Sequence, residues 1–170
     1  MSKDWLDNLF GAEDQERQKE ASAKENRERS ARILQEKWPA LASRTRAEAE
    51  QLVARFNAGM QQRRGVNWKP LLFKTGGGDA FAVEREYPFT GVTVAFDASK
   101  YRVIVRHTLR ETFDRELIAV IEAKGNYNTG DVDYWIVERN GEVFPHGKHQ
   151  YLSSVAEFAL QPVIQDAMKD

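Results

Sequence analysis

The side chains best suited to chemistry are an acid and a base two residues apart, Glu122 and Lys124, with Asp114 upstream. In a β-strand, residues i and i+2 point to the same face, so the first two would lie side by side. Two carboxylates can hold Mg²⁺ through oxygen ligands, and a lysine beside them can polarise the attacking water. Asp114, Glu122 and Lys124 are therefore candidate catalytic residues for a metal-dependent hydrolysis.

Over residues 114–124 this arrangement resembles the pattern of restriction-endonuclease-like nucleases, an acid followed by Asp/Glu-x-Lys. The resemblance implies a Mg²⁺-dependent nuclease. In that family a crossover helix follows the strand and leads to a parallel strand, whereas residues 125–130 here have the length of a loop. The sequence therefore favours the other interpretation, a strand that ends in solvated charges, and no cofactor is predicted.

Histidines are the other residues with metal chemistry. His146 and His149 lie three apart in a polar segment, and His107 is the only other histidine. Imidazoles can bind a metal when further ligands complete the site, and Asp131 and Asp133 are the acids that could join them. Because the spacing supplies no third ligand, a polar surface loop is the preferred interpretation.

A small-molecule pocket between sheet and helices is a further possibility, since cores of this kind often contain one. The polar and aromatic residues that could line it are Tyr101, His107, Tyr134 and Trp135.

One cluster of bases and aromatic residues precedes the strands. Its members are Arg63, Arg64, Lys69 and Lys74 with Trp68 and Phe73. Such clusters can bind single-stranded nucleic acid. However, the net charge of −1 gives no general attraction for nucleic acid, and a helix dipole accounts for bases at a helix end. Nucleic acid is therefore not an expected partner.

Residues 5–10 carry an apolar face in helical spacing, which we call the tip: Trp5, Leu6, Leu9 and Phe10. A short apolar face of this kind is typical of a helix that docks in a groove on a partner. Folding back on its own domain, or fraying, is the alternative. Gly11 follows at a position that predicts a helix stop.

Between residues 12 and 37, acids and bases alternate in equal number, many of them three or four apart. This pattern predicts a solvated helix held by ion pairs, with no apolar seam for a coiled coil. We call residues 1–37 the arm, and we expect residues 38–170 to form the folded domain.

Five segments rich in β-branched and aromatic residues lie at 81–87, 92–96, 101–105, 116–122 and 132–137. The short turns between most of them predict antiparallel hairpins. An edge strand at 66–74 and a short strand at 143–144, after an Asn-Gly turn, would extend the sheet.

Helical patterns flank these strands. An apolar stripe predicts a long helix over residues 40–64 with Gly65 as its cap, and Pro39 either starts that helix or kinks a continuous one. A capping box at Ser154 opens a C-terminal helix that Pro162 kinks or divides. The fold class is therefore α+β: a single antiparallel sheet of five to seven strands flanked by a long N-terminal helix and a broken C-terminal helix, preceded by the charged helical arm.

Alternation along the strands gives the sheet two faces. One face carries Val83, Val94, Val105 and Ile121 and is the predicted core. The other is small and apolar in the middle, with acids and arginines around it. If the helices leave this second face uncovered, it is a binding platform or a dimer surface.

The chain of 170 residues contains no cysteine. Disulfides, thiolate metal sites and a cysteine nucleophile are thereby excluded. No segment has the apolar run of a signal peptide or of a membrane span. We therefore expect a cytoplasmic protein with no membrane span.

These features predict a non-catalytic protein-interaction or adaptor domain. It would bind a protein partner, or a second copy of itself as a homo-oligomer, through the arm, the second sheet face, or both. The alternative is a small ligand-binding domain or enzyme with a pocket between sheet and helices, for which the nuclease chemistry of Asp114, Glu122 and Lys124 is the specific candidate.

Overall fold

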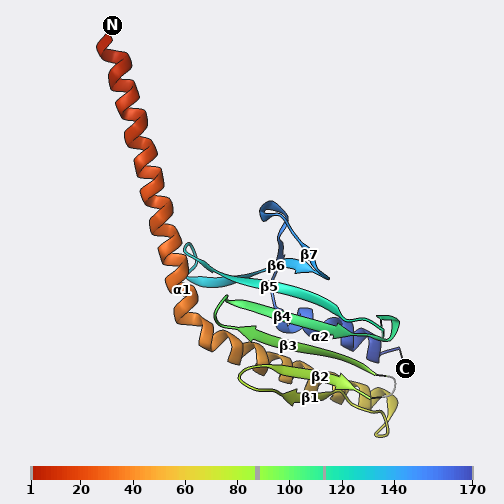
Figure 1. Cartoon of the computed structure of the whole chain (residues 1–170). Helices are drawn as coiled ribbons and strands as arrows, with labels where there is room; N and C mark the ends of the chain where they lie inside the picture. The colour runs from red at the N-terminus through yellow and green to blue at the C-terminus, as the bar shows by residue number, and fades with distance from the viewer. Residues whose placement is uncertain (1, 87–88, 113, 170) are drawn as a thin grey trace.

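A computed structural model of the chain describes residues 2–86, 89–112 and 114–169. Within these residues the helices are α1 (Ser2–Arg64) and α2 (Val155–Ala167), with short 3-10 helices at Arg110–Thr112 and His146–Lys148. The strands are β1 (Leu72–Thr75), β2 (Phe81–Arg85), β3 (Thr90–Asp97), β4 (Arg102–Thr108), β5 (Leu117–Asn126), β6 (Asp131–Arg139), β7 (Glu142–Val143) and β8 (Gln150–Leu152). The predicted α+β class is confirmed (Figure 1). Neither of the α-helices described is long and apolar enough to cross a lipid bilayer.

One helix of 63 residues, α1, runs through both Gly11 and Pro39. The predicted stop at Gly11 is therefore wrong, because a glycine inside a helix costs only about 1 kcal/mol. Pro39 lies inside α1 and does not start a new helix, and Figure 1 shows α1 changing direction in its orange part, near residue 40. The helix ends as predicted at Gly65, which has a φ of 94° and whose N–H donates to the carbonyl of Gln61 at 2.8 Å.

The arm lies within α1 and projects away from the sheet (Figure 1). Every residue from 4 to 25 is exposed, a length of ~32 Å along the helix axis. Two of the predicted ion pairs form on it, Arg17 with Glu13 at 2.8 Å and Arg29 with Glu25 at 3.0 Å. The predicted division after residue 37 falls inside the same helix.

The sheet is antiparallel, as predicted. Each strand from β1 to β6 pairs with the next one in the chain, and β6 also pairs with β7 and β8. Its eight strands exceed the predicted number because β8 was not anticipated. Asn140 and Gly141, with φ of 52° and 85°, make the predicted tight hairpin between β6 and β7. The predicted strand end at Tyr87 and the residue after it lie outside the described residues.

The predicted edge strand at 66–74 is shorter than expected, since β1 begins at Leu72. Side chains, and not a neighbouring strand, satisfy the backbone that precedes it. The Asn57 amide accepts from the N–H of Leu71 and donates to its carbonyl, both at 2.8 Å. Arg85 Nε donates to the carbonyl of Lys69, also at 2.8 Å.

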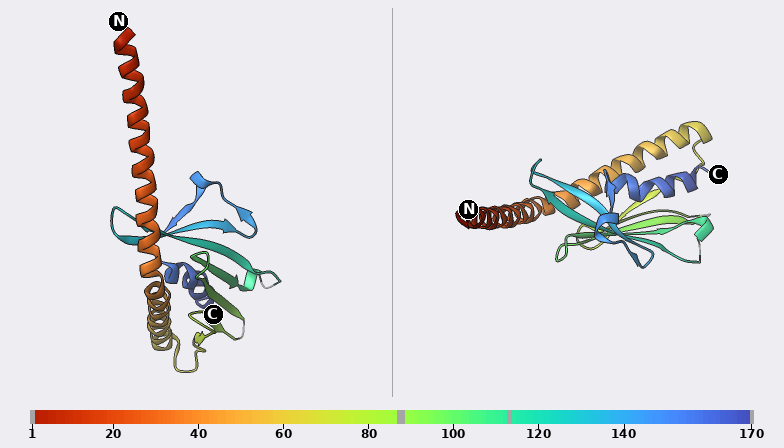
Figure 2. Two further views of the ribbon diagram at one scale, coloured as in Figure 1. Left: turned by 60° about the vertical axis from the view of Figure 1, so that its left-hand side comes forward. Right: turned by 90° about the horizontal axis from the view of Figure 1, so that it is seen from above.

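Both helices cover the same face of the sheet, as the view from above shows (Figure 2). This is the predicted core face, and Val83, Val94, Val105 and Ile121 are almost completely buried on it. We call the opposite side the open face. Its central side chains, all exposed or half-buried, are Thr93, Ala95, Ile104, Ile118 and Val120.

The C-terminal helix α2 begins at the predicted capping box, where the Ser154 hydroxyl accepts from the N–H of Glu157 at 3.1 Å. Pro162 lies inside α2. Of the two predicted alternatives, a kink or a division into two helices, the division is therefore wrong.

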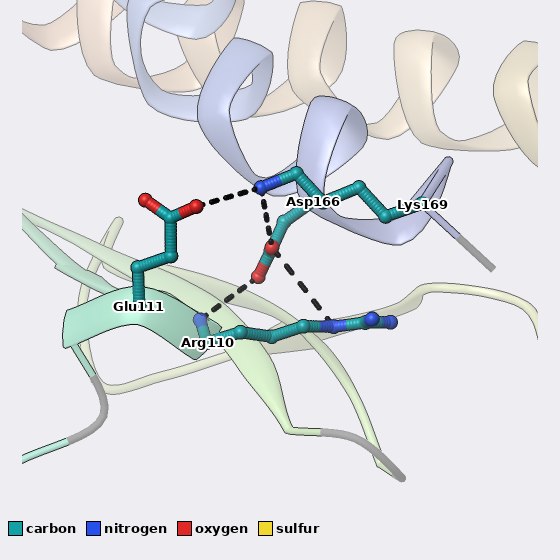
Figure 3. Close-up of polar contacts among 4 residues, drawn as sticks. All are labelled: Arg110, Glu111, Asp166 and Lys169. Carbon is teal, nitrogen blue, oxygen red and sulfur yellow. Dashed lines mark hydrogen bonds and ion pairs between the residues drawn. The ribbon is translucent and has the colours of Figure 1, made fainter.

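A buried carboxylate ties the end of α2 to the segment after β4 (Figure 3). Asp166 is 3% exposed and accepts from the backbone N–H of Arg110 at 3.0 Å. The same carboxylate lies 3.9 Å from Arg110 Nε and 3.7 Å from Lys169 Nζ, and Lys169 reaches Glu111 at 3.4 Å. This group fixes α2 against the sheet.

Candidate functional site

A hollow with a volume of about 760 Å³, which we call the cleft, lies where α1 crosses the end of β5. Its wall on α1 includes Ala23, Arg27 and Leu34, and its wall on the sheet includes Tyr101 and Lys124. The volume is within the ~300–1,000 Å³ range of small-molecule sites.

The two backbones approach each other very closely at this crossing. A Cβ placed on Gly125 would lie 2.1 Å from the carbonyl oxygen of Ser30, and 3.0 Å from its Cα. Real Cβ atoms do not come that near to a backbone oxygen, so only glycine allows α1 to lie on β5 at this point. The cleft opens beside this contact.

The Tyr101 wall of the cleft is held rigidly. Tyr101 has a φ of 51°, and its carbonyl accepts from the N–H of Ala123 at 3.0 Å. Its ring meets Trp38 of α1 edge-on at 5.4 Å between centroids. These contacts join β4, β5 and α1, so the cleft is formed before anything enters it.

The cleft is electropositive. Its lining carries three bases, Arg27, Lys100 and Lys124, against one acid, Glu122. Glu122 lies 3.9 Å from Lys124 and 3.8 Å from Arg102. The excess of bases over acids in this lining therefore favours an occupant with negative charge.

The predicted nuclease residues do not gather in one place. Glu122 and Lys124 share the cleft and the same ion pair. Asp114 precedes β5, whereas Glu122 lies five residues into that strand, ~16 Å further along. β5 continues through a short turn into the antiparallel β6, so the crossover helix of that family is replaced by a hairpin.

The histidines likewise remain apart. The rings of His146 and His149 lie 5.6 Å apart near the surface, at the first residue of the second 3-10 helix and at its C-cap. His107 is buried under α2. Among the described residues, no group of three or more histidine, aspartate and glutamate side chains is placed to hold a metal ion.

The four predicted ligand-binding residues are divided between the two faces of the sheet. Tyr101 lines the cleft, and Tyr134 lies on the core face, where it hydrogen-bonds Thr45 of α1. Burial raises the pKa of Tyr134 to about 12, so its phenol stays protonated at neutral pH. Trp135 lies on the open face, with its ring edge-on to Tyr151 at 5.3 Å.

His107 is a structural residue. Its Nε2 donates to the carbonyl of Ala159 at 2.7 Å, and its ring meets Phe158 edge-on at 5.9 Å. Burial lowers the pKa of His107, and the nearby Arg139 guanidinium lowers it further, so the imidazole is neutral in the folded protein.

We expect stability to decrease as the pH falls below about 6.5, because His107 then takes up a proton more readily in the unfolded chain than in the folded one. The His107 contribution is complete above the unfolded pKa and is lost as the pH falls through the lower folded pKa. Urea unfolding between about pH 7 and about pH 5 measures this. His107→Gln, which keeps a donor for Ala159, should show a smaller decrease, and an unchanged decrease would contradict the assignment.

The two remaining predicted surfaces, the tip and the basic and aromatic cluster, differ in how far their rings are exposed. The tip is exposed, with Trp5 57% and Leu9 56% accessible. In the basic and aromatic cluster, by contrast, Trp68 is buried under Arg85 and Phe73 stacks on Phe81 at 5.4 Å. Those rings therefore offer no stacking surface for bases.

Arg27, Lys100 and Gly125 were not among the predicted functional residues. Only Gly125 had a signal in the sequence, since a glycine at the end of an apolar strand often marks a close backbone approach. The tip and the cleft are the two surfaces that the geometry of the described residues brings forward. Comparisons with protein-family models, with characterised proteins and with solved structures found nothing that matches the chain.

Proposed function

We propose that the protein is a non-catalytic interaction protein, in which the arm presents the tip to a protein partner. The observation that carries the proposal is the exposure of four large apolar side chains, Trp5, Leu6, Leu9 and Phe10, on a helix that projects away from the domain. Tryptophan and other aromatic side chains supply much of the binding energy in protein interfaces.

The spacing of the tip supports this function. Trp5 and Leu9, and likewise Leu6 and Phe10, are four residues apart and so lie one above the other on α1. This is the arrangement by which amphipathic helices enter apolar grooves. The polar helix between tip and domain then acts as a spacer.

The open face is the second surface that supports an interaction function. Its apolar centre is flanked by two ion pairs, Arg102 with Glu122 at 3.8 Å and Arg106 with Glu116 at 3.7 Å. An apolar patch with a charged rim suits a protein contact, between different chains or between two copies. A chain without cysteine suits the reducing cytoplasm, where we place this interaction.

The alternative, a ligand-binding domain or enzyme, receives less support. Its polar candidates are divided between the two faces of the sheet. Asp114 precedes β5, whereas Glu122 lies well inside that strand. The residues therefore do not converge on one reacting atom, which general acid–base or metal catalysis would require.

The test compares association of the intact chain with that of a Trp5→Ala, Leu9→Ala double variant. Capture from native cell extract and light scattering report binding to other proteins and to further copies. Removing two central aromatic and aliphatic anchors should weaken association about 30-fold or more. Helix content should not change, because both side chains are exposed.

The matched control is Asn8→Ala, Gln15→Ala, which changes the polar side of the same helix. It should bind as the intact chain does. If the double tip variant associates as well as this control does, the tip is not the binding surface and the proposal fails.

A further inference from the structure

Resting on the proposed function, we propose that the tip of a second copy of this chain occupies the cleft. Two arms lie antiparallel, and each copy inserts its tip beside the base of the other arm. Three independent features of the described residues support this exchange: the direction of the tip, the lining of the cleft and the distribution of charge along the arm.

The tip and the cleft lie on the same side of α1. At 3.6 residues per turn, positions 18 apart are separated by five whole turns, or ~27 Å along the axis, and point the same way. Trp5 is 18 residues before Ala23, and Leu9 is 18 before Arg27; both later residues line the cleft. One side of a single helix therefore offers both surfaces, and a two-fold pair can form both contacts at once.

The cleft suits apolar side chains at its floor. Leu34, Ala31, Tyr101 and Ala123 contribute to it, and Leu34 and Ala123 are buried there. A cavity of about 760 Å³ has room for more than one large side chain. The exposed Trp5 and Leu9 supply such groups.

Charge along the arm is complementary only in the antiparallel direction. Residues 4–16 contain five acids and no base, whereas residues 17–32 contain six bases and three acids. Antiparallel arms place the acidic half of one copy against the basic half of the other, and parallel arms would place like charges together. At the ends, Asp4 and Asp7, which flank the tip, meet Arg27 and Lys100 in the lining of the cleft.

Charge reversal tests this pairing directly. Asp4→Lys, Asp7→Lys in one chain and Arg27→Glu, Lys100→Glu in another change exposed side chains only. Light scattering should find dimers of twice the 19.5 kDa chain mass for the intact protein and mainly monomers for each variant by itself. An equimolar mixture of the two variants should recover the dimer, because every reversed tip then meets a reversed cleft. The dimer of the intact protein should also weaken as salt rises.

Disulfide trapping tests the contact itself, since the chain has no cysteine of its own. Mixed Leu9→Cys and Ala23→Cys chains should form a covalent heterodimer in a thiol redox buffer, because Ala23 lines the cleft and lies opposite Leu9 in this register. The matched control replaces Ala21, two residues away but on the opposite side of α1. We expect at least ~10-fold less cross-linking with Ala21→Cys than with Ala23→Cys, because the control thiol faces away from the partner.

Two results would overturn the exchange. In the first, the intact chain stays monomeric at all concentrations, and the cysteine pair cross-links as slowly as its matched control. The other is a dimer that forms but survives the charge reversals, which would mean that another surface, such as the open face, holds the copies together. In either case, tip-dependent capture of a different protein would still sustain the proposed function, so the two failures are distinguishable.

Discussion

Replacing Gly125 by alanine is expected to lower the free energy of unfolding by about 1–3 kcal/mol, the usual cost of overpacking. The new methyl carbon would lie 2.1 Å from the Ser30 carbonyl oxygen, far inside van der Waals contact. That oxygen belongs to the helix backbone, so no side-chain rotation can relieve the overlap. Either α1 lifts from β5 or the strand shifts, and in both cases the cleft changes shape.

Urea unfolding measures the loss, and limited proteolysis near Arg29 and Arg32 reports whether α1 has lifted. Gly11→Ala is the matched control, because a Cβ there meets nothing within 4 Å. Alanine favours the helix over glycine by about 1 kcal/mol, so this control should stabilise α1 slightly or have no effect. A Gly125→Ala protein as stable as the control would contradict the close approach.

Asp166→Ala should destabilise the protein by about 2–3 kcal/mol. The change leaves the backbone N–H of Arg110 without its acceptor and removes a buried partner from the guanidinium at 3.9 Å. Lys169 contributes less, because it is mostly solvated. The end of α2 should therefore loosen from the sheet.

Asp166→Asn separates the two effects, since its amide oxygen can still accept from Arg110 while the charge is lost. We expect about half of the alanine effect, measured by thermal and urea unfolding. The rate of hydrogen exchange at the α2 amides should rise more in the alanine variant than in the asparagine variant. Equal losses in the two variants would show that charge, and not the hydrogen bond, holds this helix.

The sheet was the most predictable part of the fold. Alternation placed Val83, Val94, Val105 and Ile121 on the buried face because a residue's side of a strand depends only on its position along that strand. The hairpin at Asn140 and the helix caps at Gly65 and Ser154 could be predicted equally well, since each depends on a few neighbouring residues.

Other features depend on contacts between distant segments. Nothing near residue 66 indicates that Asn57 will satisfy the backbone of Leu71 and displace the expected strand. Whether the helices cover one face or two depends on how the connections route the chain. The cleft is set by the angle at which α1 crosses β5, and Gly125 only permits that approach.

The order of the elements has a consequence for synthesis on the ribosome. Strands β1 to β6 follow one another both in the chain and in the sheet, so the sheet can assemble as it emerges. Helix α1 packs against β5 and β6, and its Leu34 lines the cleft together with Ala123 of β5. Those strands are made roughly 100 residues later, a delay of about 5–20 s at ordinary rates of elongation. The nascent helix therefore carries an uncovered apolar stripe while most of the rest of the chain is being synthesised.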